Sequence, residues 1–435
     1  MTAEPVSAGP GLAALLPELE WRGILQATTP GLPDRLASGR RIAGYIGFDP
    51  SAPSLHVGHL VPIFGLLRLQ RFGGRPVAVV GGGTGMIGDP SGRSSERNLL
   101  DRESLDANVS SIRSQLERFL DFRAGEGGAL MVNNLDWLGA FTLIEFLRDV
   151  GKHFTVPYML AKDSVQVRLD RGLSFTEFSY MLLQAADFEH LHRTMGVELQ
   201  MGGADQWGNI TAGLELIRRR GGVAEGAADP AHGLAYKLLL SPSGAKFGKS
   251  EGGESVWLDP GRTSPFAFYQ YWLNTDDRDV GTYLRWFTEL PRHEIERLEA
   301  ALASRPEARE AQRALARDIT TRTHGPEAAA SAEQQAASVF DRGLVHLRPD
   351  EFAAAAAELP RVTLAVEPSW TAAATAVASG AASSNGEARR LVSQGGLYIN
   401  DERITDPNAT LPEPLHGRFW VIRKGKKDTR IVERA

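Results

Sequence analysis

Two histidines three residues apart, His56 and His59, stand between an apolar run at 41–48 and a helical pattern that begins near residue 60. In the first turn of a helix this spacing puts both imidazoles on one face. Two ring donors beside the free N–H groups of a helix N-terminus would bind an anion, and Gly58 would let a flat base approach the backbone. A metal pair and two surface histidines are the alternatives, although no acidic or His partner stands at helical spacing nearby.

A glycine-rich loop follows the apolar run at 76–80. Residues 83–88 read G-x-G-x-x-G, but a dinucleotide-binding turn of that pattern opens a helix, whereas residues 89–92 read as a further turn. A phosphate-binding P-loop would need a lysine where Arg93 stands. We therefore expect the loop to present its backbone and Asp89 to a small ligand, with a purely structural turn as the alternative.

Three polar side chains share one face of an expected helix at 174–187. Tyr180, Gln184 and Asp187 are spaced i, i+4 and i+7 on a segment that is otherwise apolar. An unpaired buried polar group costs about 1–3 kcal/mol, so these side chains need partners. A polar ligand would supply them, and an internal side-chain network is the alternative.

Two further loops carry polar side chains. Asp205 and Gln206 follow a strand-like run at 198–201 and suit ribose hydroxyls or the ammonium and carboxylate of an amino acid. Lys246 and Lys249 lie in a Gly- and Ser-rich stretch at 241–253. Such a flexible loop would hold two cations still only if an anion ordered it, and a solvated loop is the other interpretation.

Alternating strands and helices are expected to position these residues. The strands are expected at 41–48, 76–80, 129–133 and 198–201, and the helices at about 60–69, 141–150 and 210–220. This alternation predicts the α/β class, with a Rossmann-like, doubly wound parallel sheet covered on both faces. Such a sheet binds ligands beyond the carboxyl ends of its strands, which is where the polar residues stand.

The rest of the chain changes character at residue 264. Residues 265–286 and 292–336 are expected to be helical, 344–370 reads as a Pro-punctuated linker, and 371–435 as a small α+β unit with helices before a strand at 397–400. We therefore expect a catalytic domain at 1–240, the lysine loop and an all-helical domain at 241–343, a linker at 344–370 and a small domain at 371–435.

Composition limits the class of protein. The chain has 435 residues, and it has no cysteine, which excludes disulfides, thiolate metal sites and cysteine nucleophiles. No apolar run approaches the roughly 20 residues of a membrane-spanning helix, and no basic flank precedes an apolar N-terminal stretch, so we expect a cytoplasmic protein. The net charge is −5, yet residues 387–435 carry ten Lys and Arg against seven Asp and Glu. The basic excess therefore lies at the C-terminal end.

Taken together, the motifs resemble those of class I aminoacyl-tRNA synthetases, and specifically the bacterial tyrosyl-tRNA synthetase family. Residues 56–59, His-Val-Gly-His, are similar to the HIGH motif, and residues 246–250, Lys-Phe-Gly-Lys-Ser, are similar to the KMSKS motif. Segments typical of the tyrosyl enzymes stand at 45–50, 88–92, 174–180 and 205–209. The resemblance runs from residue 18 nearly to the C-terminus.

The resemblance implies activation of tyrosine by ATP, with release of pyrophosphate, followed by transfer of tyrosine to the 3′ end of tRNA. The amino-acid carboxylate attacks the α-phosphorus directly, so no general base is needed. Catalysis is then positioning and stabilisation of charge on the phosphates. The resemblance assigns this role to six side chains and to a magnesium ion that accompanies ATP, with no metal site expected on the protein itself. The six side chains are His56, His59, Arg93, Arg97, Lys246 and Lys249.

The resemblance also assigns the binding residues. Tyr45 and Asp187 are implied to hydrogen-bond the substrate hydroxyl, Thr84 to border the pocket, and three other side chains to hold the ammonium group: Asp89, Tyr180 and Gln184. The implied nucleotide-binding residues are Asp49, Gly58, Asp205, Gln206 and Lys249. Ile46 and Pro62 stand where some members have Cys and Thr, which leaves the ribose contacts open.

Residues 371–435 resemble the S-four-type RNA-binding module, which implies phosphate contacts there. The implied contacts are Arg389, Arg390, Arg403 and Lys424, and Arg218 and Arg219 are candidates for the tRNA acceptor arm. The resemblance further implies a homodimer. A tryptophanyl-tRNA synthetase, an inactive RNA-binding regulator and, from the G-x-G-x-x-G match, a nicotinamide dehydrogenase are the competing interpretations.

Overall fold

The computed structural model describes residues 11–89, 102–123, 125–169, 172–222, 229–239, 247–248, 255–356, 359–365, 370–425 and 428–435. The chain forms two compact units. The first comprises residues 1–263 and 271–323, and the second comprises residues 264–270 and 324–435. No helix in the described ranges is both long enough and apolar enough to cross a membrane.

A six-stranded sheet forms the centre of the first unit, with the strand order β1-β6-β5-β2-β3-β4. The strands are β1 Leu25–Thr28, β2 Ala43–Phe48, β3 Arg75–Val80, β4 Leu130–Asn133, β5 Val197–Gly203 and β6 His232–Tyr236. Strands β2 to β6 pair in parallel, whereas β1 pairs antiparallel with β6. The prediction of a parallel, doubly wound sheet is therefore confirmed by five strands, and β1 adds an antiparallel strand at one edge. The sequence analysis identified neither β1 nor β6.

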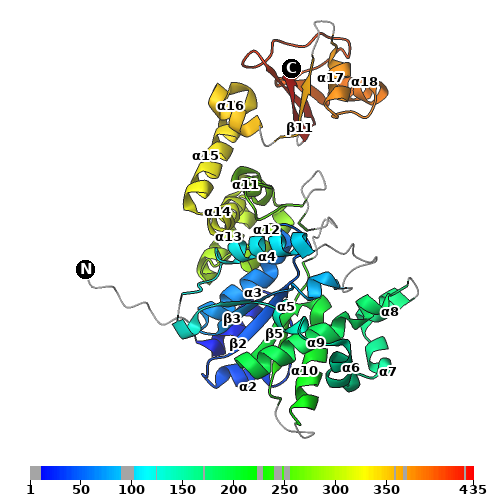
Figure 1. The fold of residues 1–435 in the computed structure, drawn as a ribbon. Helices are drawn as coiled ribbons and strands as arrows, with labels where there is room; N and C mark the ends of the chain where they lie inside the picture. The colour runs from blue at the N-terminus through cyan, green and yellow to red at the C-terminus, as the bar shows by residue number, and fades with distance from the viewer. Residues whose placement is uncertain are drawn as a thin grey trace. The chain divides into compact units, whose positions relative to one another are not determined.

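Helices cover both faces of this sheet (Figure 1). Helix α3, Leu60–Arg71, packs on one face, where Leu69 fills the space beside Gly44 of β2. Helices α9, Phe175–Met195, and α10, Trp207–Arg220, pack on the other, where Phe188 of α9 contacts Tyr45. Neighbouring residues of β2 thus face opposite layers, as the alternation of side chains along a strand requires.

Further elements complete the sheet domain. They are η1 Leu12–Ala14, α1 Leu15–Trp21, α2 Leu32–Ala37, η2 Val57–His59, η3 Thr84–Met86, α4 Arg102–Leu116, η4 Gly125–Gly127, α5 Leu135–Leu138, α6 Leu143–Asp149, η5 Gly151–His153, α7 Val156–Leu160, α8 Asp163–Leu169 and η6 Ala204–Gln206. Helix α4 supports the loop before η2, because Asn108 donates to the carbonyl of Pro50 and Gln115 accepts from the N–H of Leu55.

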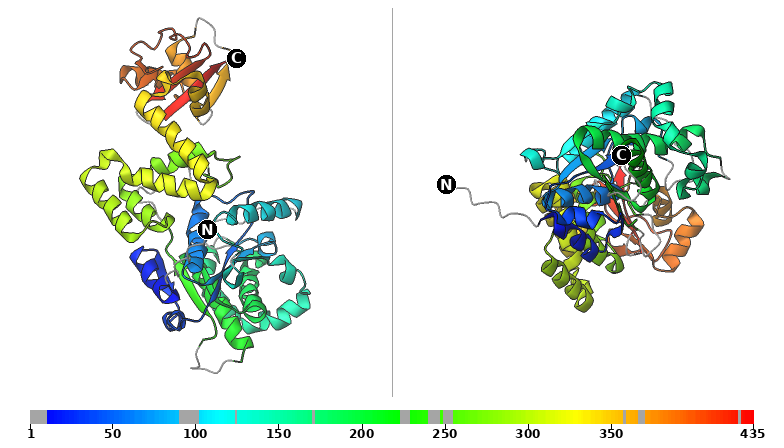
Figure 2. Two further views of the ribbon diagram at one scale, coloured as in Figure 1. Left: turned by 90° about the vertical axis from the view of Figure 1, so that its left-hand side faces the viewer. Right: turned by 90° about the horizontal axis from the view of Figure 1, so that it is seen from below.

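A run of helices follows, as predicted for residues 265–336, and further views of it are given in Figure 2. They are α11 Pro265–Leu273, α12 Asp277–Phe287, α13 Arg292–Ser304, η7 Pro306–Ala308, α14 Glu310–His324 and α15 Pro326–Arg342. A buried ion pair joins α3 to the end of α12: the Arg68 guanidinium lies 2.9 Å from Glu289. The same guanidinium donates to the carbonyl of Trp286 at 2.7 Å.

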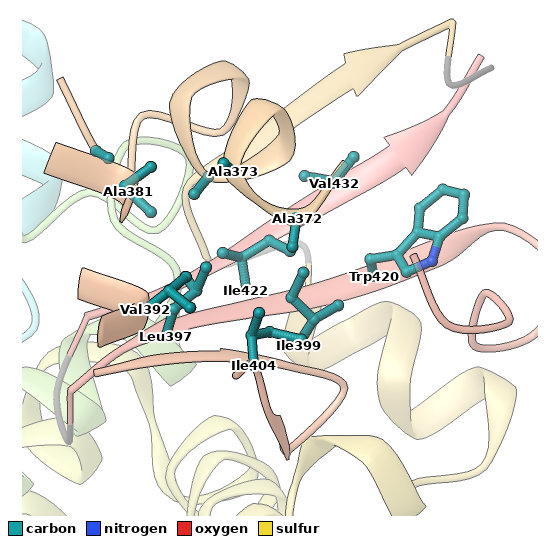
Figure 3. Close-up of a cluster of buried hydrophobic side chains, with 13 residues drawn as sticks. Ala372, Ala373, Ala381, Val392, Leu397, Ile399, Ile404, Trp420, Ile422 and Val432 are labelled. Carbon is teal, nitrogen blue, oxygen red and sulfur yellow. The ribbon is translucent and has the colours of Figure 1, made fainter. Parts of the chain in front are cut away.

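The second unit contains a five-stranded sheet with the order β7-β11-β10-β8-β9. Its elements are η8 Leu344–His346, α16 Pro349–Ala356, β7 Arg361–Leu364, α17 Ala372–Ala378, α18 Asn385–Ser393, β8 Leu397–Ile399, β9 Glu402–Arg403, β10 Phe419–Lys424 and β11 Asp428–Arg434. Figure 3 shows its core, in which Trp420 and Ile422 of β10 and Val432 of β11 face the small side chains of α17. Alanines there let the helix lie close to the sheet.

The linker predicted at 344–370 is wrong for its central part. Residues 361–364 form β7, which pairs in parallel with β11. Glu433 of β11, almost fully buried, accepts from Arg361 at 2.9 Å and also pairs with Arg418 at 2.5 Å. This segment is therefore part of the C-terminal sheet and not a spacer in front of it.

Candidate active site

A cavity of about 930 Å³ opens in the first unit, where loops follow the carboxyl ends of β2, β3, β5 and β6. It lies at the point where the strand order reverses between β2 and β5, the usual ligand position in such sheets. Twelve of the predicted tyrosine-binding, nucleotide-binding and catalytic residues line it: Tyr45, Asp49, His56, Gly58, His59, Thr84, Asp89, Tyr180, Gln184, Asp187, Asp205 and Gln206. Arg93, Arg97, Lys246 and Lys249 lie outside the described residues.

The two histidines cap the turn that precedes α3. The Nδ1 of His56 accepts the N–H of Gly58 at 3.0 Å, and the Nδ1 of His59 accepts the N–H of His56 at 3.1 Å. Because each Nδ1 is an acceptor, hydrogen bonding assigns the proton of each neutral ring to Nε2. Both rings are thereby fixed as Nε2–H donors, with centroids 4.2 Å apart. This is the protonation that an anionic ligand would use.

Gly58 is needed for a reason that the sequence did not indicate. A Cβ built on this residue would lie 2.6 Å from Cε1 of the His56 ring, so any side chain would displace the imidazole. The sequence analysis expected glycine to admit a flat base to the backbone. In the structure, the histidine ring already occupies that side of Gly58.

Asp49 links the tyrosine-binding and nucleotide-binding sets of predicted residues. Its Oδ1 accepts the hydroxyl of Thr84 at 2.8 Å, and its Oδ2 accepts the hydroxyl of Tyr180 at 3.1 Å. Burial and the nearby carboxylate of Asp49 raise the pKa of the Tyr180 hydroxyl well above its usual value. Tyr180 therefore stays a neutral donor at physiological pH.

Asp187 is buried at the inner end of the cavity and is held by two donors. The indole N–H of Trp137 reaches Oδ1 at 2.7 Å, and the amide of Asn134 reaches Oδ2 at 2.8 Å. Burial raises the pKa of this carboxyl to about 7, although both hydrogen bonds oppose the shift. Asp187 thus changes its protonation close to neutral pH.

The hydroxyl of Tyr45 is buried beside Asp187 and has no hydrogen-bond partner among the described residues. Burial and the carboxyl of Asp187 raise the pKa of this hydroxyl well above its ordinary value. A buried hydroxyl without a partner costs free energy. A ligand that carries a hydroxyl would satisfy Tyr45 and Asp187 together.

A chain of amides crosses the wider part of the cavity. Gln184 donates to Gln206 at 3.3 Å, and Gln206 donates to Asp89 at 2.7 Å, while Asn209 donates to the same Gln206 oxygen at 3.2 Å. Burial, together with the charge of Asp89, raises the pKa of Asp205. These acceptors and carboxylates suit a positively charged group or sugar hydroxyls.

Three lining or supporting residues were missed by the sequence analysis: Asn134, Trp137 and Gln200. Asn134 also donates to Thr84 at 2.9 Å and accepts the N–H of Gly83 at 2.7 Å. The Oε1 of Gln200, whose strand position pairs with Tyr45, is buried without a partner among the described residues. A usable signal existed for Asn134, since a polar residue directly after an apolar strand stands where ligands bind.

Comparison with known proteins agrees with this geometry. Residues 37–341 match the family of tRNA synthetases class I (W and Y), and residues 351–432 match the tyrosine–tRNA ligase SYY-like C-terminal domain. The tyrosine–tRNA ligase of Roseiflexus castenholzii is 49% identical over 429 residues, which cover 97% of this chain and 99% of that protein. The chain belongs to the tyrosine–tRNA ligase family.

Other members of the family give the same result. The tyrosine–tRNA ligase of Geobacillus stearothermophilus is 47% identical over 435 residues, covering 97% of this chain and all of that protein. The solved structure of a C-terminally truncated mitochondrial tyrosyl-tRNA synthetase from Aspergillus nidulans is similar to this chain with a TM-score of 0.66. The two sequences are 31% identical, and the match covers 75% of this chain and 94% of that one.

The candidate RNA-binding residues of this tyrosine–tRNA ligase family member are not among those that line the cavity. Arg218 pairs with Glu215 at 3.0 Å, and Arg219 pairs with the same carboxylate. In the second unit, Lys424 pairs with Glu387 at 2.8 Å, and the remaining candidates, Arg389, Arg390 and Arg403, are exposed. Their predicted role toward RNA remains a prediction.

Proposed function

We propose that this protein joins L-tyrosine to ATP, releases pyrophosphate and transfers the tyrosyl group to the 3′ end of tRNA(Tyr). One observation carries the choice of amino acid: a hydroxyl donor and a carboxyl acceptor, Tyr45 and Asp187, are buried side by side at the inner end of the cavity. A phenol hydroxyl satisfies both. Phenylalanine would leave the Tyr45 hydroxyl unpaired and would give Asp187 no donor, and the indole of tryptophan has no acceptor for Tyr45.

The ammonium group of tyrosine is proposed to bind at the wider end, beside Asp89, Gln184 and Tyr180. Support comes from Gln206, which is hydrogen-bonded to both Gln184 and Asp89, and from the hydrogen bond of Tyr180 to Asp49. In the unliganded protein, Gln184 donates to Gln206 and Gln206 donates to Asp89. The bound ammonium would take the place of these amide donors and would donate to the same acceptor oxygens. Charge-assisted hydrogen bonds of this kind are roughly twice as strong as neutral ones.

In the first step, the tyrosine carboxylate attacks the α-phosphorus of ATP, a bond forms between carboxylate oxygen and phosphorus, and pyrophosphate leaves. A carboxylate is already a nucleophile at neutral pH, so the site needs no general base. The site instead positions tyrosine and ATP and supplies hydrogen-bond donors to the phosphates. We assign the donors to the Nε2–H groups of His56 and His59 and to the side chains of Arg93, Arg97, Lys246 and Lys249.

Magnesium is proposed to arrive with ATP and not in a cage of protein ligands. Among the described residues, no group of three or more His, Asp or Glu side chains is arranged to hold a metal. Magnesium commonly binds through substrate phosphates with few protein ligands. We therefore assign no residue of the chain as a metal ligand and no step to a protein-held ion.

For the second step, the basic C-terminal unit and the end of α10 are proposed to contact tRNA. The residues assigned are Arg218, Arg219, Arg389, Arg390, Arg403 and Lys424. Phosphate contacts by such side chains would make tRNA affinity fall steeply with salt. Because the tRNA substrate is cytoplasmic, we also propose this location for the protein.

A homodimer is proposed through an apolar patch on the first unit. The patch consists of Leu143, Ile144, Leu147, Val156, Val167 and Phe175, and the three most exposed of these, Leu143, Ile144 and Phe175, are 70%, 72% and 76% exposed. Six large apolar side chains exposed on helices α6 to α9 support an interface there. We expect Ile144→Asp to shift the protein to monomer in sedimentation velocity, while Met195→Asp, an exposed apolar position outside the patch, leaves the dimer intact.

The test of the function is ATP–pyrophosphate exchange with tyrosine, phenylalanine or tryptophan as the amino acid. We expect exchange with tyrosine and at least about 1,000-fold less with the other two, because a site built for a hydroxyl rejects analogues that lack it. Exchange that depends on tryptophan but not tyrosine would overturn the assignment. Transfer to tRNA(Tyr) transcripts then tests the second step.

A further inference from the structure

Phe247, which stands between the two halves of the lysine motif, packs into a group of aromatic side chains from α11 and α12. Its ring stacks on Phe287 with a centroid distance of 5.5 Å and an interplanar angle of 5°. Tyr283 meets it edge-on at 5.4 Å, and Trp272 lies at 6.1 Å. We call Trp272, Tyr283 and Phe287 the aromatic socket. All three are buried.

Gly248, the next residue, is held by its backbone. Its N–H donates to the hydroxyl of Tyr271 at 3.3 Å, and its carbonyl accepts the N–H of Val256 at 3.1 Å. Its φ of 90° is one that side chains rarely allow. A Cβ built here would lie 3.7 Å from both the Nδ1 of His56 and the N–H nitrogen of Gly58, so the backbone of Gly248 runs against the histidine turn.

The same turn is tied to the chain that follows the loop. Val57 donates its N–H to the carbonyl of Val256 at 3.0 Å, and Leu258 donates to the carbonyl of Leu55 at 2.8 Å. The socket also contacts helix α3, because the ring centroids of Phe287 and Phe64 lie 6.3 Å apart. Helix α3 starts directly after His59. One aromatic cluster thus contacts both Phe247 and the helix that follows the histidines.

We propose that the aromatic socket and the Tyr271 hydroxyl fix Phe247 and Gly248 against the histidine turn, and so act as positioning residues for the two lysines of the motif. The inference rests on the proposed function of those lysines. Lys246 and Lys249 are the covalent neighbours of Phe247 and Gly248. Fixing the two central residues therefore limits how far the lysine Cα atoms can lie from the imidazole donors.

Positioning the two lysines is expected to stabilise the transition state of adenylate formation. A long lysine side chain loses about 2 kcal/mol of rotamer freedom when it is held, and a displacement of about 1 Å at a reacting group can cost 100-fold in rate. Because Phe247 packs against the buried rings of the aromatic socket, part of the loop's conformational freedom is already lost before ATP binds. The helical region thereby contributes to nucleotide activation without touching the substrate.

The test separates positioning from stability with matched variants. Phe247→Ala empties the socket, and Tyr271→Phe removes only the hydroxyl that accepts the N–H of Gly248. Phe119→Ala removes another buried ring, which contacts Phe64 and has no ring contact with Phe247, and controls for general destabilisation. The measurements are the single-turnover rate of tyrosyl-adenylate formation, the Kd of tyrosine, and hydrogen exchange of the peptide that contains Phe247 and Gly248.

We expect Phe247→Ala to slow adenylate formation by roughly 10- to 100-fold and Tyr271→Phe by about 3- to 10-fold. In both, the Kd of tyrosine stays within about twofold of the wild-type value, and exchange at Gly248 becomes faster without any substrate. Phe119→Ala lowers the Tm but leaves the rate per folded molecule unchanged.

Wild-type rates in both Phe247→Ala and Tyr271→Phe, or a loss of rate in Phe119→Ala equal to that in Phe247→Ala, would overturn the inference. A wild-type protein that forms no tyrosyl-adenylate would overturn the proposed function instead. In that case, hydrogen exchange alone decides whether the socket holds Gly248. Unchanged exchange in both variants refutes the anchor itself.

Discussion

The indole Nε1 of Trp137 lies 2.7 Å from the Oδ1 of Asp187, a carboxyl group fully buried at the end of the cavity. Together with Asn134 on the other oxygen, this donor leaves the carboxyl one orientation, with its remaining lone pairs toward Tyr45 and the cavity. Trp137 and Asn134 thus fix the orientation of the carboxyl group that is proposed to accept the substrate hydroxyl.

Replacing Trp137 with Phe removes this donor while keeping a ring to stack on His190, which lies 4.6 Å away in a nearly parallel arrangement. With one hydrogen bond lost, the pKa of Asp187 rises further, and less of the acceptor form is present at neutral pH. We expect tyrosine affinity to fall about 10-fold, as measured by isothermal titration calorimetry. An unchanged Kd would show that Asn134 alone orients the carboxyl.

Tyrosine binding is expected to depend on pH through Asp187. Burial raises the pKa of this carboxyl from 3.8 to about 7 in the unliganded protein, and the bound hydroxyl favours the ionised form. Affinity therefore rises with pH up to about 7 and levels off above it, with about a tenfold gain between pH 6 and pH 8. Tyrosine titrations across this range test the prediction, and Asp187→Asn is the control that loses the dependence.

The unpartnered hydroxyl of Tyr45 predicts opposite effects on stability and binding. Tyr45→Phe keeps the ring against Phe188 and removes the buried hydroxyl, so the unliganded protein is expected to gain about 1–3 kcal/mol of unfolding free energy. Tyrosine binding is expected to weaken about 10-fold, and the preference over phenylalanine to narrow. Thermal unfolding with and without ligand measures both. A destabilised variant would mean that the hydroxyl has a partner in the unliganded protein.

Lys249→Ala tests whether this lysine acts by stabilising charge on the phosphates, as expected for a reaction that needs no general base. Because the lysine is proposed to stabilise charge on the phosphates only as it develops, its loss is expected to slow adenylate formation by roughly 100- to 1,000-fold. The Kd of tyrosine stays close to normal. The assigned role is falsified if tyrosine binding is lost while the activation rate is preserved.

The sequence was sufficient to predict which of the proposed tyrosine-binding residues line the cavity, because motif and strand-end position both pointed to them. Tyr45, Asp89 and Asp187 come from different segments, yet each stands in or after a predicted strand or on one helix face, and all three line one cavity. The supporting layer was not predictable in the same way. Trp137 contacts Asp187 across 50 residues, a distance that no local periodicity encodes.

The errors in the fold have local physical causes. Residues 361–364, Arg-Val-Thr-Leu, alternate in polarity as a strand should, but prolines at 360 and 368 favoured a linker. Their partner is more than 60 residues away in β11. Strand β6 is short, starts with histidine and contains glycine, so its β-signal is weak until β5 and β1 pair with it.

In the C-terminal sheet, the last strand of the chain is a central strand and not an edge strand. Strand β11 lies between β7 and β10 and pairs with both. A premature stop before Asp428 would expose the edges of two strands at once, and such edges readily pair with other chains. We therefore expect truncation at this point to produce a protein that aggregates.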